Sequence, residues 1–349
     1  MSGRVILTGS STGGHLYPLI AIAQEFGSDR CLFIGSERKM DVGIVQEYGF
    51  RHLGIPVTRF HPLRWCRALW RSRRYIREFR PSVVVGSGGY VTVPVLVMAW
   101  LLRVPILLLE QNIIPGRVTR FMSKVAKKIC VSFDQNKGYL PSEKMVTTGN
   151  PLRKYWLKDA AYKAFSSVRI QTDRVLLVLG GSQGSLAINR FLEANYEVLM
   201  GKGYTVIHLV GRAYYKSHYD QDYYTMISAK DGLAKVYVMP YFENMAYLYG
   251  LSDVVLARAG ATTLAELSYY QIKAILVPYP YATEDHQRSN AEAIVQQKMA
   301  IMLDESLLSW SALSSALLQL RSVWSDASVP DCARMAVCDQ IDQLMAGRL

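Results

Sequence analysis

Glycine-rich turns that follow short apolar runs are the segments of this sequence best suited to chemistry. The first, Gly9–Pro18 (GSSTGGHLYP), comes directly after Val5–Leu7, and similar turns begin at Gly86 (GSGGY) and Gly180 (GGSQGS). A fourth candidate is Arg258–Glu266 (RAGATTLAE). Glycine lets the backbone approach a ligand closely, and a helix that follows presents free N–H groups with a partial positive charge. Several such turns facing one cleft would suit a diphosphate, although a single one could be only a tight connection.

The known phosphate fingerprints do not fit the first turn. Its glycines at positions 9, 13 and 14 do not follow GxGxxG, and His15-Leu16 stands where a Walker ATPase has Lys-Ser or Lys-Thr. A lone histidine is usually structural, but His15 follows two glycines at the expected carboxyl end of a strand, so it should face a ligand. Because an imidazole titrates near neutrality, it can accept a proton from a hydroxyl group. The turn therefore favours acid–base chemistry.

The elements that position these turns alternate between strands and helices. Apolar runs of strand length are Val5–Leu7, Cys31–Ile34, Val83–Val85, Ile106–Leu109 and Lys128–Val131, then the run within Asp173–Ser185, and Thr205–Leu209, Lys235–Val238, Val254–Ala257 and Ala274–Val277. Helix-like stretches such as Leu19–Phe26 and Met40–Tyr48 separate them. This alternation predicts an α/β protein with doubly wound parallel sheets of the Rossmann-like type. In such sheets ligands bind beyond the carboxyl ends of the strands, where each glycine turn falls.

The chain is expected to form two such domains. Its 349 residues suffice for two cores, and the strand pattern restarts at Asp173 after a segment that contains Pro151 and lacks a clear strand. We predict an N-terminal domain at residues 1–155 and a C-terminal domain at 156–349. A last helix, at about 332–349, could pack back on the N-terminal domain.

The formal net charge of +12 is concentrated in one aromatic segment, Arg59–Arg80, which carries eight arginines. Such a basic amphipathic helix favours contact with a membrane surface. The residues proposed for that contact are Phe60, Arg64, Trp65, Arg67, Trp70 and Arg71. A packed helix whose arginines face water is the alternative, and no nucleic-acid reader motif accompanies the segment.

Membrane-spanning, secreted and disulfide-bonded classes are not supported. The apolar stretch Val91–Glu110 contains Pro94, Arg103 and Pro105, so it is predicted to split into a short buried helix and the strand Ile106–Leu109. The amino terminus has only a three-residue apolar run, unlike a secretory signal. Five cysteines without CxxC pairing indicate a reducing cytoplasm.

Seven short motifs resemble, in the same order, those of the MurG family of bacterial N-acetylglucosaminyltransferases. They are TGGHLYP near the start, GSGGYVTVP at 86–94, EQNIIPG at 110–116, GNPLR at 149–153, GGSQGS at 180–185, RAGATTLAE at 258–266 and DHQRSNA at 285–291. The resemblance spans roughly residues 3–300. It implies the two-domain GT-B fold and transfer of GlcNAc from UDP-GlcNAc to the C4 hydroxyl of the muramoyl sugar of lipid I. The anomeric configuration inverts, and the product, lipid II, serves peptidoglycan synthesis, cell shape and cell division.

The resemblance also implies roles for individual positions. His15 matches the general base, and Tyr90 and Glu110 match positions on the acceptor side. The donor-binding positions are Thr12, Gly13, Gly14, Asn112, Arg153, Ser182, Phe242, Ala261, Thr262, Thr263, Leu264, Ala265, Glu266 and Gln287.

Five of these donor positions have a more specific implied contact. Arg153 and Ser182 match residues near the leaving diphosphate, where a guanidinium and a hydroxyl stabilise developing charge. Phe242 falls where backbone groups read the uracil. Glu266 matches a ligand of both ribose hydroxyls, and Gln287 matches a ligand of the GlcNAc ring.

The implied partners are UDP-GlcNAc, undecaprenyl-linked lipid I, anionic lipids of the cytoplasmic leaflet and possible cell-wall and division proteins, without nucleic acid. The protein is thus expected to be peripheral on the inner membrane. No cofactor or obligatory metal is expected, because helix N-termini and Arg153 can stabilise the leaving group. Asp220–Asp222 (DQD) mimics a DxD metal motif but lies in a tyrosine-rich segment rather than at a strand end.

Three departures from the family pattern and two rival functions remain. Ser10-Ser11 replaces glycines, Leu109 stands where many members have histidine, and Asp41 replaces a common glutamate.

A UDP-GlcNAc 2-epimerase shares the fold but would have no need of the basic segment Arg59–Arg80 at a membrane. A non-catalytic sugar-nucleotide or membrane-tethering subunit is the other rival, although both halves and His15 are present.

Overall fold

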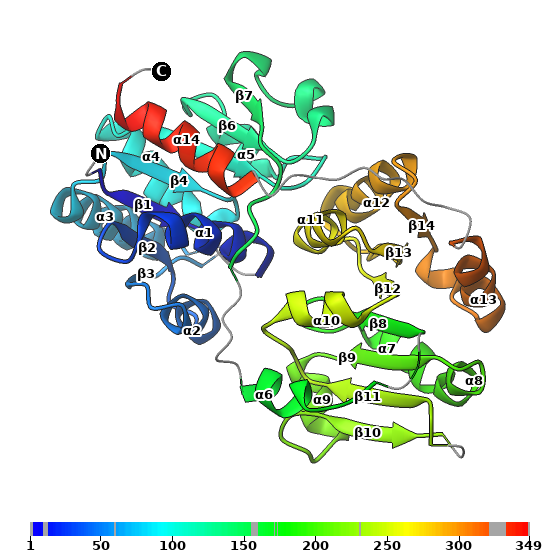
Figure 1. Cartoon of the computed structure of the whole chain (residues 1–349). Helices are drawn as coiled ribbons and strands as arrows, with labels where there is room; N and C mark the ends of the chain where they lie inside the picture. Colours follow the sequence, from blue (N-terminus) through cyan, green and yellow to red (C-terminus); the bar gives the residue numbers. More distant parts are fainter. Residues whose placement is uncertain are drawn as a thin grey trace. The chain divides into compact units, whose positions relative to one another are not determined.

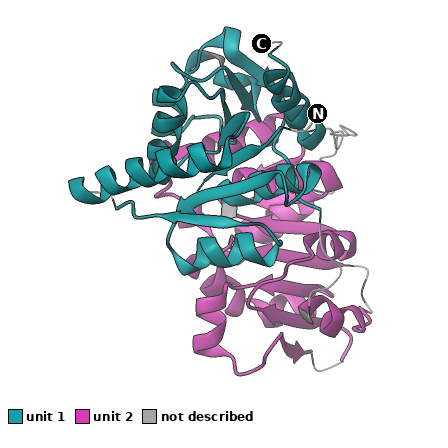
Figure 2. Cartoon of the chain, turned by 90° about the vertical axis from the view of Figure 1, so that its left-hand side faces the viewer, with its two compact units in different colours: residues 1–154, 330–349 teal, residues 155–329 magenta. Residues whose placement is uncertain are grey.

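The computed structural model describes residues 3–9, 13–58, 61–154, 160–170, 172, 174–229, 232–320 and 333–347. The chain divides into two compact units (Figure 2): the first contains residues 1–154 and 330–349, and the second contains residues 155–329. Thr12 and Phe60 of the predicted sites, and the Ser10-Ser11 pair, lie outside the described residues.

The first unit is a seven-stranded parallel sheet with helices on both faces (Figure 1). Its elements are β1 (Val5–Thr8), α1 (Gly13–Phe26), β2 (Cys31–Ser36), α2 (Lys39–Glu47), β3 (His52–Ile55), α3 (Pro62–Phe79), β4 (Val83–Gly86), α4 (Val93–Leu101), β5 (Ile106–Glu110), α5 (Arg117–Met122), β6 (Lys128–Val131), β7 (Met145–Thr147) and α14 (Ala333–Met345). The strand order is β3-β2-β1-β4-β5-β6-β7. One core lies under α1, α2 and α14, and the other lies under α3, α4 and α5.

Helix α14 follows the second unit in the sequence but packs in the core of the first. Val337, Ile341 and Leu344 recur at helical spacing and are buried with Leu16 and Leu19 of α1. In Figure 1 this helix, in red, lies beside α1. The chain therefore passes from the first unit to the second and back again.

The second unit repeats the architecture. Its elements are α6 (Ala160–Ser166), β8 (Val175–Leu179), α7 (Leu186–Glu193), α8 (Tyr196–Gly201), β9 (Thr205–Leu209), α9 (Arg212–His218), β10 (Thr225–Ser228), β11 (Lys235–Met239), α10 (Met245–Leu251), β12 (Val254–Ala257), α11 (Ala261–Tyr270), β13 (Lys273–Leu276), α12 (His286–Gln296), β14 (Ala300–Met302) and α13 (Trp310–Gln319). The strand order is β10-β11-β9-β8-β12-β13-β14, and only β10 is antiparallel to its neighbour. The predicted fold class, two doubly wound α/β units, is confirmed.

The apolar stretch Val91–Glu110 splits as predicted, into α4 and β5 around Arg103, which has a left-handed φ of 59°. Over the part of the chain that the structure describes, no helix has both the length and the apolar character needed to cross a bilayer. The described cysteines, Cys31, Cys66, Cys130 and Cys338, are all free thiols.

Candidate active site

The first unit gathers three predicted segments at one edge of its sheet. Strands β1, β4 and β5 are neighbours and run parallel, so their carboxyl ends meet. Helix α1, with His15 in its first turn, is the next element after β1, Ser87–Gly89 follows β4, and Gln111–Asn112 follows β5. This is the edge at which doubly wound sheets bind ligands.

His15 lies in the first turn of α1, and its position is fixed from β4. The Ser87 hydroxyl donates a hydrogen bond of 2.8 Å to the His15 carbonyl oxygen. Gly88 has a φ of 100°, and a Cβ there would lie 3.3 Å from His15 Cε1. A side chain at position 88 would therefore strain the backbone and crowd the imidazole, so glycine leaves the space that His15 occupies.

Glu110 folds the loop that follows β5. Its carboxylate is 3 % exposed and accepts hydrogen bonds from the backbone N–H groups of Asn112, at 3.1 Å, and Gly116, at 3.0 Å. Burial raises the pKa of Glu110, whereas the hydroxyl of Thr119 and the N–H donors oppose that rise. The carboxylate is thus engaged within its own loop, so its first effect is to shape the segment that carries Asn112.

Asn136 supports the same loop from outside. Its side-chain amide donates to the carbonyl oxygens of Asn112, at 3.0 Å, and Ile113, at 2.8 Å. The segment therefore has a defined conformation. Tyr90, the other predicted acceptor-side residue, begins a 3₁₀ turn at Tyr90–Thr92 and packs partly into the core under α4.

Arg153 belongs to the first unit and is nearly buried. It is 7 % exposed, and its guanidinium carbon lies 3.7 Å from the ring centroid of Tyr17 and 5.8 Å from that of Tyr48. Its neighbours are tied to the same unit, because Lys154 and Gln24 exchange two hydrogen bonds, at 2.7 and 3.0 Å. Cation–π stacking therefore holds the guanidinium against Tyr17 of α1, with Tyr48 at the end of α2 farther away.

In the second unit, the Gly180–Ser185 turn follows β8 and is tightly packed. Gly184 has a φ of 76°, and a Cβ there would lie 2.0 Å from the carbonyl oxygen of Val210. Ser185 is the N-cap of α7, and its hydroxyl accepts from the N–H of Ile188 at 3.4 Å. Ser182 is exposed on this rigid turn, where its hydroxyl is accessible to a ligand. A pocket of about 440 Å³ borders the turn on the side of α7 and α9.

Arg258 ties three loops of this edge together and was not singled out from the sequence. It is 8 % exposed, its Nη1 donates to the carbonyl oxygens of Val277 and Pro278, both at 3.1 Å, and its Nη2 donates to Ser185 Oγ at 2.6 Å. It also forms an ion pair with Glu305. The arginine at the start of RAGATTLAE gave no signal for this role, because its partners are distant in sequence.

Helix α11 presents its first turn at the carboxyl end of β12. Gly260 precedes it in an extended conformation, and Ala261 to Ala265 occupy the amino-terminal turns, of which only Leu264 is a core side chain. Glu266 is 7 % exposed, and the hydroxyl of Tyr249 on α10 donates to its Oε2 at 2.8 Å. The N–H groups at this helix start suit an anionic ligand.

Phe242 and Gln287 lie on two further loops of the second unit. Phe242, in the turn after β11, is 1 % exposed and packs edge-on against Phe165, with ring centroids 6.2 Å apart. Its side chain therefore anchors the turn and leaves only backbone groups for recognition. Gln287 of α12 accepts from the N–H of Tyr279 at 2.9 Å. The turn before α12 is strained, because Asp285 has a φ of 53°.

A buried chain of hydrogen bonds runs behind the Gly180–Ser185 turn. Asn189 Nδ2 donates to the Val210 carbonyl oxygen at 3.0 Å, so Asn189 Oδ1 accepts from His208 Nε2 at 3.2 Å. His208 Nδ1 is then the acceptor for the Tyr196 hydroxyl at 2.6 Å. Nδ1 can accept from Tyr196 only while the imidazole is neutral, and burial lowers the pKa of His208 to about 3.

This neutral histidine is expected to make stability depend on pH. Below the unfolded pKa of 6.5 only the unfolded chain takes up the proton, so stability present above pH 6.5 is lost progressively down to about pH 3. Between pH 7 and pH 5 the loss should be about 2 kcal/mol. Denaturant unfolding of the whole chain at both pH values measures it, and His208→Gln should flatten the dependence. An equal pH dependence in His208→Gln and in the exposed control His218→Gln would contradict this explanation.

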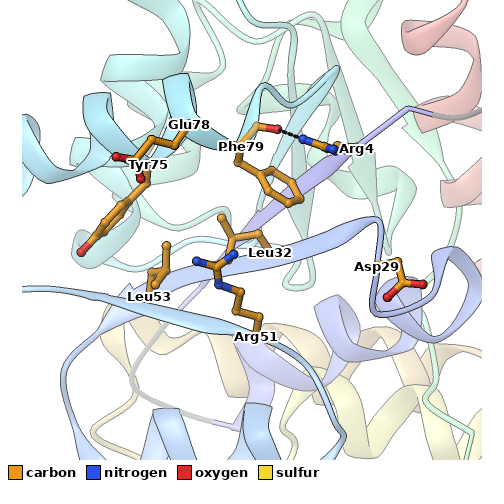
Figure 3. A pocket seen from close by; sticks show the side chains of 8 residues that line it. All are labelled: Arg4, Asp29, Leu32, Arg51, Leu53, Tyr75, Glu78 and Phe79. Atoms are coloured by element: carbon orange, nitrogen blue, oxygen red, sulfur yellow. Dashed lines mark hydrogen bonds between the residues drawn. The ribbon is translucent and has the colours of Figure 1, made fainter.

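A second pocket, of about 290 Å³, opens at the opposite, amino-terminal edge of the first sheet (Figure 3). It is lined by Arg4, Asp29, Leu32, Arg51, Leu53, Tyr75, Glu78 and Phe79. Arg4 donates at 3.0 Å to the carbonyl oxygen of Phe79, the last residue of α3. Two arginines of this lining, Arg4 and Arg51, are balanced by the carboxylates of Asp29 and Glu78, and the carboxyl end of α3 adds a partial negative charge. The pocket therefore does not suit a diphosphate.

A metal site was not expected from the sequence. Among the residues that the structure describes, no three His, Cys, Asp or Glu side chains are grouped so that they could hold a metal ion. Asp220 and Asp222 lie in the connection between α9 and β10.

Comparison with known proteins gives the class and then the family. The N-terminal and C-terminal domains of glycosyltransferase family 28 match residues 5–131 and 175–333. The crystal structure of MurG from Acinetobacter baumannii superposes with a TM-score of 0.69 at 22 % identity, covering 98 % of this chain and 99 % of that one. A UDP-GlcNAc 2-epimerase from Methanocaldococcus jannaschii gives 0.63 at 13 % identity, with 97 % and 99 % coverage. Likeness at these identities shows the fold, which is that of the GT-B enzymes.

Relatives found by sequence similarity identify the family more specifically than the fold does. The UDP-N-acetylglucosamine--N-acetylmuramyl-(pentapeptide) pyrophosphoryl-undecaprenol N-acetylglucosamine transferase of Desulfotalea psychrophila is 36 % identical over 346 residues, covering 91 % of this chain and 88 % of the relative. The Bacillus subtilis protein of the same name is 32 % identical over 329 residues, with 90 % and 89 % coverage. The chain belongs to glycosyltransferase family 28 and, within it, to the MurG family.

Proposed function

We infer that this protein transfers GlcNAc from UDP-GlcNAc to lipid I and so makes lipid II. The observation that carries this inference is the match, at 30 % identity or more over about nine-tenths of the chain, to transferases named for that reaction. The GT-B fold is shared with epimerases, so the fold alone does not choose between them. The C4 hydroxyl as acceptor and inversion at the anomeric carbon are the finer parts of the proposal.

The first unit supplies the proposed base. His15 takes the proton from the acceptor hydroxyl as that oxygen attacks the anomeric carbon, and the bond from that carbon to the diphosphate oxygen breaks. The support is the position of His15 at the carboxyl edge of the sheet, with its backbone held by Ser87 and its ring facing the space left by Gly88. Thr12, Gly13, Gly14 and Asn112 are proposed to contact the donor, and Tyr90 and the loop shaped by Glu110 are proposed to face the acceptor.

The second unit supplies most of the proposed donor contacts. The charge on the leaving diphosphate is stabilised by the Ser182 hydroxyl and by the start of α11, from Ala261 to Ala265. Arg153, which belongs to the first unit, is proposed for the same role. Backbone groups at Phe242 read the uracil, Glu266 binds the ribose hydroxyls and Gln287 binds hydroxyls of GlcNAc. The support is a rigid turn with an exposed hydroxyl, a helix start at a strand end and an anchored Phe242. Metal-independent transfer is part of the proposal.

The test of this function is incubation with UDP-GlcNAc and a lipid I analogue, with and without a chelator. Disaccharide-lipid should form equally in both samples. Formation of UDP-N-acetylmannosamine from UDP-GlcNAc alone would instead identify the 2-epimerase. Binding of UDP-GlcNAc without any product would identify a non-catalytic subunit, and loss of product with chelator would contradict metal independence.

We also propose that α3 places the protein on the anionic cytoplasmic leaflet as a peripheral protein. Leu63 and Trp70 are 67 % and 61 % exposed on α3, and Trp100 and Leu101 are 52 % and 57 % exposed at the end of α4, which packs against α3. Large apolar side chains beside arginines are typical of interfacial helices. Contacts with cell-wall or division proteins stay a prediction.

Two side chains of the predicted patch have partners within the protein. The indole N–H of Trp65 donates to the Thr58 carbonyl oxygen at 2.9 Å, and this half-buried ring packs against the core under α3. Arg71 pairs with Glu37 at 2.6 Å. The exposed Arg64 and Arg67 are therefore the better probes of the patch.

Charge reversal at Arg64 and Arg67 is expected to weaken binding to anionic liposomes. Each arginine near such a surface contributes about 1 kcal/mol, so the double Glu variant should partition at least about 30-fold less. Sedimentation with phosphatidylglycerol vesicles measures this loss, while activity on a water-soluble acceptor should persist. The double variant of exposed Lys163 and Lys216 in the second unit makes the same charge change. An equal loss of liposome binding in both variants would contradict the patch, because net charge alone would then explain the binding.

A further inference from the structure

The carboxylate of Glu266 is held by a phenol from another helix. Tyr249 lies on α10, is 2 % exposed, and donates its hydroxyl to Glu266 Oε2 at 2.8 Å. Both groups are buried, so the hydrogen bond is shielded from water and is stronger than it would be at the surface. No part of the predicted site accounts for this tyrosine.

The ring of Tyr249 is itself fixed by the helix that carries Glu266. It stacks on Tyr270 of α11, with ring centroids 5.2 Å apart and an interplanar angle of 27°. Because Tyr270 follows Glu266 by four residues, both face the same side of α11. Tyr249 therefore touches α11 at two successive turns, and its hydroxyl cannot swing away from the carboxylate without losing the stacked contact.

Helix α10 also begins directly after the turn that contains Phe242. The ring of Tyr247 on α10 stacks on Phe242, with centroids 6.4 Å apart and an interplanar angle of 26°. One short helix thus joins the turn assigned to the uracil and the carboxylate assigned to the ribose. The distance between these two recognition points is set by α10, through Tyr247 at one end and Tyr249 at the other.

We propose that Tyr249 is a positioning residue for the ribose of the nucleotide: it fixes the carboxylate of Glu266 in the orientation that accepts the ribose hydroxyls. The proposal rests on the proposed role of Glu266. An unrestrained glutamate loses side-chain entropy when it binds a diol, whereas a carboxylate already oriented by a phenol has lost that entropy on folding. Tyr249 acts only through Glu266 and does not itself touch the ligand.

The test is a double-mutant cycle with Tyr249→Phe and Glu266→Ala, read by calorimetric titration with UDP and with 2′,3′-dideoxy-UDP. Tyr249→Phe removes the hydroxyl that donates to the charged carboxylate of Glu266, so it should weaken UDP binding about tenfold. The same substitution should have little effect on dideoxy-UDP, and little effect on UDP once Glu266 is alanine. In turnover, the KM for UDP-GlcNAc should rise while kcat stays nearly constant.

A matched control separates positioning from loss of packing. Tyr215 is another buried tyrosine of the second unit, 4 % exposed, whose hydroxyl bonds to Thr225 Oγ1 at 3.1 Å. Tyr215→Phe should leave UDP affinity unchanged. Equal weakening of UDP and dideoxy-UDP by Tyr249→Phe, or an undiminished effect in the Glu266→Ala background, would overturn the proposal. Unchanged UDP affinity in Glu266→Ala alone would instead overturn the ribose assignment on which it rests.

Discussion

Replacing His15 with alanine is expected to lower kcat for transfer to a lipid I analogue by about 10²–10⁴-fold, the range that a general base contributes. Affinity for UDP-GlcNAc should stay close to that of the unchanged protein, because the proposed target of the imidazole is the acceptor hydroxyl and not the donor. Turnover at saturating donor and calorimetric titration with UDP-GlcNAc measure the two effects separately.

The local structure makes this variant a clean test of chemistry. Ser87 bonds to the backbone carbonyl of residue 15, at 2.8 Å, and alanine keeps that bond and favours the helix. Gln in place of His15 keeps a polar side chain but cannot take up a proton near neutral pH, so it should be as poor as alanine. His218→Ala changes an exposed histidine of α9 and should have no effect. Near-normal turnover of either His15 variant would contradict its assignment as the base.

Arg258→Ala is expected to have the second large effect, a loss of stability of the second unit. The guanidinium satisfies carbonyl groups of the loop after β13, the N-cap hydroxyl of α7 and the carboxylate of Glu305. Removing one member of such a buried set leaves its partners unpaired and costs about 3–5 kcal/mol. The melting temperature should fall by about 10 °C, at about 2–4 °C per kcal/mol.

Donor binding should weaken as well, because Arg258 fixes Ser185 at the end of the turn that carries Ser182. Thermal unfolding and the KM for UDP-GlcNAc measure the two effects. Arg258→Lys keeps the charge but loses the planar fork, so it should recover only part of the loss. Arg174→Ala, which removes an exposed arginine bonded to a single carbonyl oxygen at 3.3 Å, is the control and should change neither quantity. Normal stability and KM in Arg258→Ala would contradict the role of a clamp.

The strands that the sequence predicts are the inner strands of both sheets, and the strands that it misses are the four at the edges. Strands β1 and β8 are buried on both faces, so they read as continuous apolar runs. The edge strands β3, β7, β10 and β14 are half-exposed and mix polar with apolar residues. Their strand conformation is set by pairing with a neighbour, which no local pattern reveals.

The glycine turns, and with them His15 and Ser182, are also determined by the sequence, because a glycine at a strand end has a local conformational reason. The resemblance to the family motifs predicts the chemistry of those positions. What only the tertiary structure decides is which groups hold the site in place: Arg258 across three loops, Tyr249 on Glu266, and Glu110 within its own loop. Their partners come from other elements or depend on burial. Spacing along the chain therefore predicts where a ligand is met, and packing alone determines how the residues that meet it are oriented.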